Sequence, residues 1–165
     1  MADVSRALVT AAEDTNYLLT VKNEESGSGA GFKRFSLGLS DINKSARPIK
    51  DRERKQCNDR GINLVEIVVA HSQDQSETLR LFVGSESLRH ESVCNFLGYC
   101  LSDNAQVVVE SHGKRLSAEE LKTSRETLRI AIAAARRTLE ASEPSDAPKD
   151  RASRSENGES TAGPQ

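Results

Sequence analysis

The stretch GINLVEIVVAHSQDQSETLRLFV, residues 61–83, decides the fold that the sequence predicts. Residues 62–70 are almost all β-branched or aliphatic, as in a strand that is covered on both faces. Residues 78–83 alternate between aliphatic side chains and others, which is typical of a strand with one buried face. The polar residues 71–76 between the two runs predict a hairpin.

Helical and strand patterns extend outward from this hairpin. The motif SAEE at 117–120 is a capping box and predicts a helix from there to about Ala141. Strands joined by short connections favour antiparallel pairing, so we expect one α+β domain over residues 1–141, with a mixed or antiparallel sheet of about five strands packed by two or three helices. The remaining predicted elements are helices at 3–13 and 85–101 and strands at 17–21, 35–39 and 105–110.

Two segments do not fit a packed core. Residues 40–60 combine a proline with seven basic side chains and two large aliphatic ones, and we expect them to form an exposed basic connection. Residues 142–165 contain three prolines and no large aliphatic side chain, which predicts a disordered tail.

Composition indicates a cellular compartment. The chain of 165 residues has three cysteines at irregular spacings, which favours free thiols in a reducing environment. It has no apolar run of the ~20 residues that span a bilayer and no pattern of a signal peptide at its start. We therefore expect a cytoplasmic protein, located in the host cytoplasm or the virion if it is viral, with no membrane partner.

Charge is sorted along the chain. Residues 32–60 carry 9 Lys and Arg against 4 Asp and Glu, and residues 112–141 carry 7 against 4. Between them, residues 61–111 carry 2 against 7. Segregation of this kind indicates a surface built for a partner, because mixed charge suffices for solubility.

Patterns for catalysis, metals and cofactors are incomplete. The segment HESVC at 90–94 has the frame of a zinc motif with cysteine in the last place, but a core position for Cys94 is the simpler interpretation. Cys57 lies among basic residues, and we expect it to be exposed with a lowered pKa. We predict no catalytic, cofactor-binding or metal-binding residues.

Two glycine segments are partly similar to phosphate-binding loops. GSGAG at 27–31 lacks the glycine spacing of a dinucleotide fold and precedes a predicted strand, so it is interpreted as a flexible loop. Gly113, Lys114 and Arg115 precede a helix and predict at most a weak anion site.

The basic segments carry the functional prediction. We expect a non-enzymatic interaction or assembly accessory protein, homodimeric and of viral or phage type, that engages an acidic protein or nucleic acid. The alternatives are a dedicated RNA- or DNA-binding protein with salt-dependent binding, an enzyme with an unrecognised site, and, for each basic segment, a merely solvated surface. The candidate contact residues are Lys33, Arg34, Lys44, Arg47, Lys50, Arg52, Arg54, Lys55, Arg60, Lys114, Arg115, Lys122, Arg125, Arg129 and Arg136.

Overall fold

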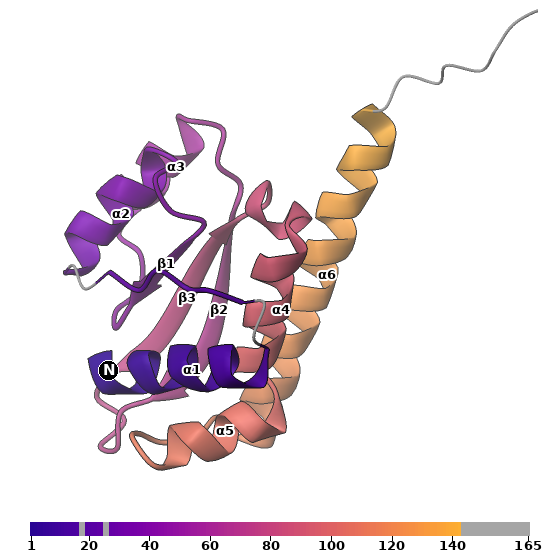
Figure 1. The fold of residues 1–165 in the computed structure, drawn as a ribbon. Coiled ribbons are helices and arrows are strands. Elements are labelled where there is room, and N and C mark those ends of the chain that lie inside the picture. The colour runs from indigo at the N-terminus through magenta and orange to yellow at the C-terminus, as the bar shows by residue number, and fades with distance from the viewer. Residues whose placement is uncertain (17–18, 25–26, 143–165) are drawn as a thin grey trace, which may run out of the picture.

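A computed structural model describes residues 1–16, 19–24 and 27–142 of the chain. The architecture is α+β, as expected (Figure 1). Its sheet has three strands in the described residues, where about five were predicted. The elements are α1 (Ala2–Thr15), α2 (Ser28–Ser36), β1 (Ile42–Ser45), α3 (Asp51–Asn58), β2 (Leu64–His71), β3 (Thr78–Gly84), the short 3₁₀ helix η1 (Ser87–Arg89), α4 (Glu91–Cys100), α5 (Asp103–Glu110) and α6 (Ala118–Ser142).

The sheet is antiparallel with the strand order β1-β3-β2. The predicted hairpin is confirmed, because β2 and β3 pair along most of their length with one irregularity between Val68 and Ala70. Expected to be central, β2 is instead at one edge, and β1 is at the other.

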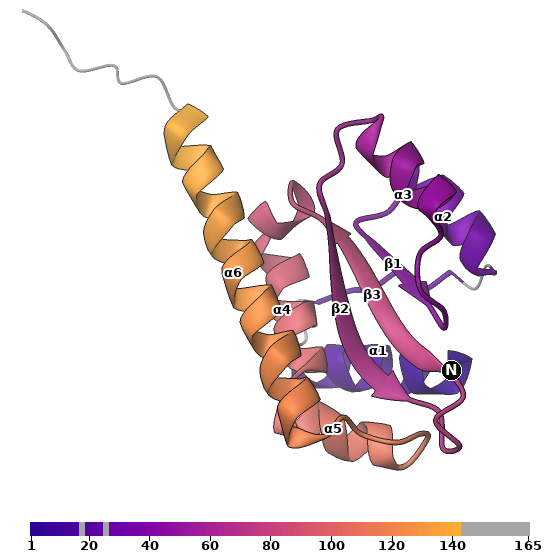
Figure 2. The ribbon, with the colours of Figure 1, turned by 180° about the vertical axis from the view of Figure 1, so that it is seen from behind.

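Each face of the sheet packs against a different set of helices. The main core joins one face, through residues such as Ile67 and Leu81, to apolar side chains of α1, α4, α5 and α6. On the opposite face Phe82 meets Phe32 of α2, with ring centroids 4.9 Å apart in an edge-to-face arrangement. Figures 1 and 2 show α2 and α3 together at the β1 end of the molecule and α6 at the β2 end.

Three predicted elements are wrong. Residues 35–39 were predicted to be a strand, but α2 runs to Ser36, and its Phe32 and Phe35, three residues apart, are both buried. Residues 105–110 were also predicted as a strand and form α5, whose N-cap Ser102 accepts a hydrogen bond from the Ala105 N–H at 3.1 Å. Residues 19–21 lie outside the sheet, and the start of that predicted strand, 17–18, is not described.

The segment 40–60 is more ordered than expected. It forms β1 and α3, and Asn43, Ser45 and Cys57 are buried. The predicted capping box of α6 is confirmed, since Glu120 Oε2 accepts from the Ser117 N–H at 2.9 Å and Ser117 Oγ accepts from the Glu120 N–H at 3.3 Å. Of the tail predicted at 142–165, Ser142 is the last residue of α6, and the rest lies outside the described residues. None of the helices in the described part of the chain has the length and apolar run that a membrane crossing requires.

Candidate functional site

The N-terminus of α2 presents open backbone to solvent. Gly27 is the N-cap, no side chain of the described residues caps the helix, and the first turn contains no acidic residue. The first helical hydrogen bond runs from the Gly31 N–H to the Gly27 carbonyl at 3.0 Å, so the N–H groups of Ser28, Gly29 and Ala30 have no partner within the helix. These donors and the positive end of the helix dipole together favour an anion.

Glycine keeps this helix end accessible. A Cβ atom placed on Gly27 or Gly29 would meet nothing within 4 Å, so the backbone there faces open space. Gly27, Gly29 and Ala30 are exposed, and Ser28 is half-buried. A ligand can therefore approach the N–H groups without displacing side chains of the described residues.

A second serine reaches this helix end from β1. Ser45 Oγ lies 3.1 Å from Ser28 Oγ and 2.8 Å from the Arg47 carbonyl oxygen, and it accepts a hydrogen bond from the Arg47 N–H at 3.2 Å. Because Ser45 has one hydroxyl proton, it cannot donate to both oxygens fully. When Ser45 Oγ donates across the 3.1 Å contact to Ser28 Oγ, the proton of the Ser28 hydroxyl can be donated to a ligand at the helix end.

An ion pair holds the chain that follows Ser45. Arg47 Nη1 and Nη2 donate to the two carboxylate oxygens of Glu53, at 2.9 and 2.6 Å, and the Arg47 guanidinium lies 5.6 Å from the centre of the Phe32 ring. The hydrogen bond with Arg47 lowers the pKa of Glu53 below its usual value, and the same bond raises the pKa of Arg47. Glu53 also accepts from the Lys50 N–H at 2.9 Å and so caps α3. Arg47 therefore positions Ser45 through this pair, which we call the Arg47–Glu53 clamp.

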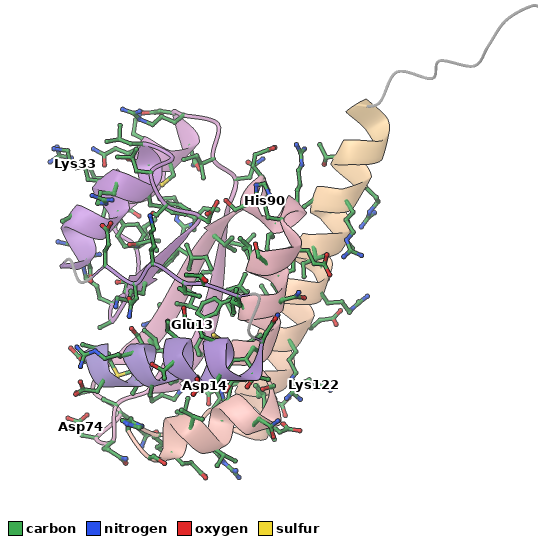
Figure 3. All side chains as sticks on the ribbon, in the orientation of Figure 1. Glu13, Asp14, Lys33, Asp74, His90 and Lys122 are labelled. Atoms are coloured by element: carbon green, nitrogen blue, oxygen red, sulfur yellow. The ribbon has the colours of Figure 1, made fainter. Side chains whose placement is uncertain are left out.

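The candidate contact residues do not form one surface. Figure 3 places Lys33 on α2 and Lys122 on α6 at opposite sides of the molecule. A single nucleic-acid surface made by residues 33–60 and α6 would require Lys33 and Lys122 to lie on the same side of the molecule. Several of the cations are engaged by carboxylates: Arg34 with Glu24 at 2.9 Å, Arg47 with Glu53 at 2.6 Å, Lys55 with Asp59 at 2.7 Å, Arg115 with Glu110 at 3.2 Å, Arg125 with Asp103 at 2.8 Å and Arg129 with Glu126 at 2.6 Å.

The remaining candidates differ in environment. Lys44 Nζ donates to Asn23 Oδ1 at 2.6 Å and to Ser5 Oγ at 2.9 Å. The others are exposed, and none has a carboxylate within ion-pair distance among the described residues; they are Lys33, Lys50, Arg52, Arg54, Arg60, Lys114, Lys122 and Arg136.

The weak anion site expected at Gly113, Lys114 and Arg115 stays a prediction, and a carboxylate already lies at the helix end beside it. Glu120 already occupies the N-terminus of α6 through the capping box, and its Oε1 lies 2.9 Å from His71 Nε2. Hydrogen bonds from Ser117, together with the smaller effect of His71, lower the pKa of Glu120. A carboxylate that stays ionised at this position repels a second anion.

The cysteines are not reactive groups of a site. Cys57, expected to be exposed with a lowered pKa, is fully buried, and burial raises its pKa. Burial also raises the pKa of Cys100 to about 12, and Cys94 Sγ donates to the Leu88 carbonyl at 3.1 Å. Among the described residues, no three His, Cys, Asp or Glu side chains are arranged to hold a metal ion.

Similar proteins and structures point to one class. No known family model matches the chain. It is 42% identical over 52 residues to the phosphate-binding protein PstS of Staphylococcus saprophyticus, a match that covers 32% of this chain and 16% of that protein. It is 39% identical over 67 residues to protein SphX of Synechococcus elongatus, covering 41% of this chain and 20% of that protein. The matches thus span less than a quarter of these relatives.

A solved structure shares the fold. A possible phosphate-binding protein from Planctomyces limnophilus superposes with a TM-score of 0.71 at 13% sequence identity, over 78% of this chain and 94% of that one. At this identity the likeness shows the fold alone.

These matches correct the functional predictions. The relatives and the fold neighbour are named for phosphate binding. This contradicts the predicted viral or phage assembly factor and both alternatives, a nucleic-acid-binding protein and an enzyme with an unrecognised site. The expected partners, a second copy of the chain and an acidic protein or nucleic acid, are wrong on the same findings, and so is the cytoplasmic or virion location. The expectation of a protein that is not an enzyme agrees with relatives named as binding proteins.

The residues of the site were not predicted from the sequence. Gly27, Ser28, Gly29 and Ser45 were not candidates, because GSGAG was interpreted as a loop before a strand. The spacing of Phe32 and Phe35 is helical and could have placed a helix directly after the glycines.

Proposed function

We propose that the chain binds phosphate at the N-terminus of α2 and acts as a binding protein without catalysis. The observation that carries the proposal is the uncapped first turn of α2, with its free N–H groups beside the Ser28–Ser45 hydroxyl pair. A tetrahedral oxyanion can accept several of these donors at once. The phosphate-binding names of the relatives and of the fold neighbour support this ligand over other anions.

Exposed cations around α2 and α3 suit an attracting role. Lys33 belongs to α2, and Lys50, Arg52 and Arg54 belong to α3 and its N-cap, which pack beside α2. None of the four has a carboxylate partner in the described residues. Charges of one sign near a site raise the association rate of an oppositely charged ligand. We therefore assign these residues to steering the anion, so their removal lowers the association rate and its dependence on salt.

The test is a calorimetric titration of the full chain with inorganic phosphate in a phosphate-free buffer. Ser28→Ala removes a hydrogen bond to a charged ligand, worth about 1.5–3 kcal/mol, and we expect binding to weaken by about 10- to 100-fold. Ala30→Glu places a carboxylate at the third helical position, where it caps the helix and competes with phosphate. This variant should lose phosphate binding while its thermal stability stays the same or rises.

A control variant shows whether the effect of Ala30→Glu comes from its position at the helix end or only from the added negative charge. Ala134→Glu adds the same charge at an exposed position of α6, far from α2, and should bind phosphate like the unmodified chain. Equal loss of binding in both glutamate variants, or full binding in Ala30→Glu, would refute the assignment to this helix end.

A further inference from the structure

The phosphate site proposed for α2 is open on one side. Gly29 and Ala30 of its first turn are exposed, and a Cβ atom added to Gly27 or Gly29 would meet nothing within 4 Å. Figures 1 and 2 show the start of α2 at the outer edge of the molecule, with no other helix or strand of the described residues beyond it. Sites for small ligands usually enclose most of the ligand surface. An ion at this helix end instead keeps part of its surface in solvent.

The donors of the site all lie on the helix side of such an ion. The free N–H groups of Ser28, Gly29 and Ala30 point out of the helix end, and the Ser28 hydroxyl lies on the β1 side, 3.1 Å from Ser45 Oγ. A tetrahedral ion that meets these donors from one side turns three oxygens toward them and the fourth away. The fourth oxygen can therefore carry a carbon substituent without meeting the described part of the chain.

The charges at this helix end suit a dianion. The first turn contains no acidic residue, and Glu24, which precedes the helix, is paired with Arg34 at 2.9 Å. A phosphate monoester has a second pKa of about 6, so at pH 8 it is a dianion like inorganic phosphate. The helix dipole and the free N–H groups attract both ions in the same way.

The site provides no aromatic surface that could recognise an organic group. The two aromatic side chains of α2, Phe32 and Phe35, are 1% and 2% exposed, so neither can stack on a base or a sugar. Phe32 packs instead on Phe82 of the sheet. The affinity of a monoester should therefore come from its phosphate head.

We propose that this site binds the phosphate head of monoesters as well as free phosphate and does not distinguish their organic groups. The inference rests on the phosphate site proposed above and adds the class of ligand. A monoester offers three free oxygens to the donors, while its ester oxygen and organic group face solvent. A phosphate diester offers only two free oxygens and one negative charge, which makes it a poor ligand. No covalent step is involved.

The test is a calorimetric titration of the full chain at pH 8 with inorganic phosphate, methyl phosphate, adenosine 5′-monophosphate and dimethyl phosphate. Both monoesters should bind within about threefold of inorganic phosphate, because each presents a dianion with three free oxygens. Dimethyl phosphate should bind at least about tenfold more weakly, because it loses a charge and one accepting oxygen.

Each result separates this inference from the phosphate site itself. If inorganic phosphate binds and methyl phosphate does not, the site is closed to esters, and only this inference fails. If neither binds, the phosphate site is refuted and the inference with it. Adenosine monophosphate that binds more than about tenfold more tightly than methyl phosphate shows that the organic group is recognised, and it overturns the proposal, as does a diester that binds as tightly as the monoesters.

Competition and two variants locate the monoester. Saturating inorganic phosphate should abolish the heat of methyl phosphate binding, since both ligands use the same donors. Ala30→Glu should lose both ligands, and Ala134→Glu, with the same charge on an exposed position of α6, should keep both. Methyl phosphate that still binds Ala30→Glu, or that binds beside saturating phosphate, occupies another site and contradicts the proposal.

Discussion

Replacing Glu53 by glutamine tests whether the Arg47–Glu53 clamp holds the site in place. The pair is largely shielded, with 12% of the Glu53 side chain and 31% of the Arg47 side chain exposed. Two charge-assisted hydrogen bonds join the residues. Glutamine can still accept from the Lys50 N–H, so the substitution removes the ion pair and spares the cap of α3.

The expected loss lies between that of an exposed pair and that of a buried one. Exposed pairs contribute up to about 1 kcal/mol, and breaking a buried pair costs about 3–5 kcal/mol. We therefore expect Glu53→Gln to lower the free energy of unfolding by about 2 kcal/mol, which moves a urea midpoint by about 1 M. Because Ser45 lies beside Arg47, phosphate affinity should fall as well.

The stability that the Arg47–Glu53 clamp contributes should depend on pH in a definite direction. Since Arg47 lowers the pKa of Glu53 in the folded chain, the pair stabilises the fold above the pKa of an unfolded glutamate, about 4.3. That stability is lost as the pH falls through the lowered folded value. The difference between the unmodified chain and Glu53→Gln should therefore be constant near neutral pH and shrink in acid.

The assay is urea unfolding followed by circular dichroism, completed as a double-mutant cycle with Arg47→Met. A coupling free energy near zero in the cycle refutes the clamp, whatever the single variants do. Glu126→Gln is the control, because the Glu126–Arg129 pair is exposed and its loss should leave the urea midpoint unchanged.

Further substitutions test the packing that supports the site. Gly113→Ala places a Cβ atom 2.7 Å from the His71 carbonyl oxygen, and we expect it to lower the free energy of unfolding by about 1–3 kcal/mol in the same urea assay. Gln106→Leu leaves buried backbone groups without their partners and should cost about 2–4 kcal/mol, whereas a change below the error of the measurement contradicts the inferred hydrogen bonds. Cys57 and Cys100 should react with a thiol reagent at pH 8 only after unfolding, and rapid labelling of the native chain at either residue shows that it is not buried.

The sequence predicts those elements that local patterns specify. The β2–β3 hairpin follows from an apolar run and an alternating run, and the start of α6 follows from a capping box. In contrast, α5 contains the run Val107–Val109, whose branched side chains favour a strand. Its helix depends on the Ser102 cap and on burial of Ala105 and Val109, and this packing overrides the local preference.

The candidate site was hidden because it depends on a contact between distant residues. Ser28 and Ser45 are 17 positions apart, and β1, with the sequence INKS, has no apolar alternation to reveal a strand. The helix after Gly27 forms where Phe32 packs on Phe82 of the sheet, which local spacing alone does not show. Six of the fifteen candidate basic residues pair with nearby carboxylates. Of the others, Lys33 and Lys122 lie on opposite sides of the molecule (Figure 3).

The most direct test of the phosphate site is a map of backbone amide chemical shifts during titration with inorganic phosphate. The first turn of α2 provides the free N–H groups, so the amide signals of Ser28, Gly29 and Ala30 should shift most and saturate with a single affinity. Sulfate and chloride at equal ionic strength provide the controls for general salt effects. The account is contradicted if these three amides do not move, or if the largest shifts lie at the N-terminus of α6.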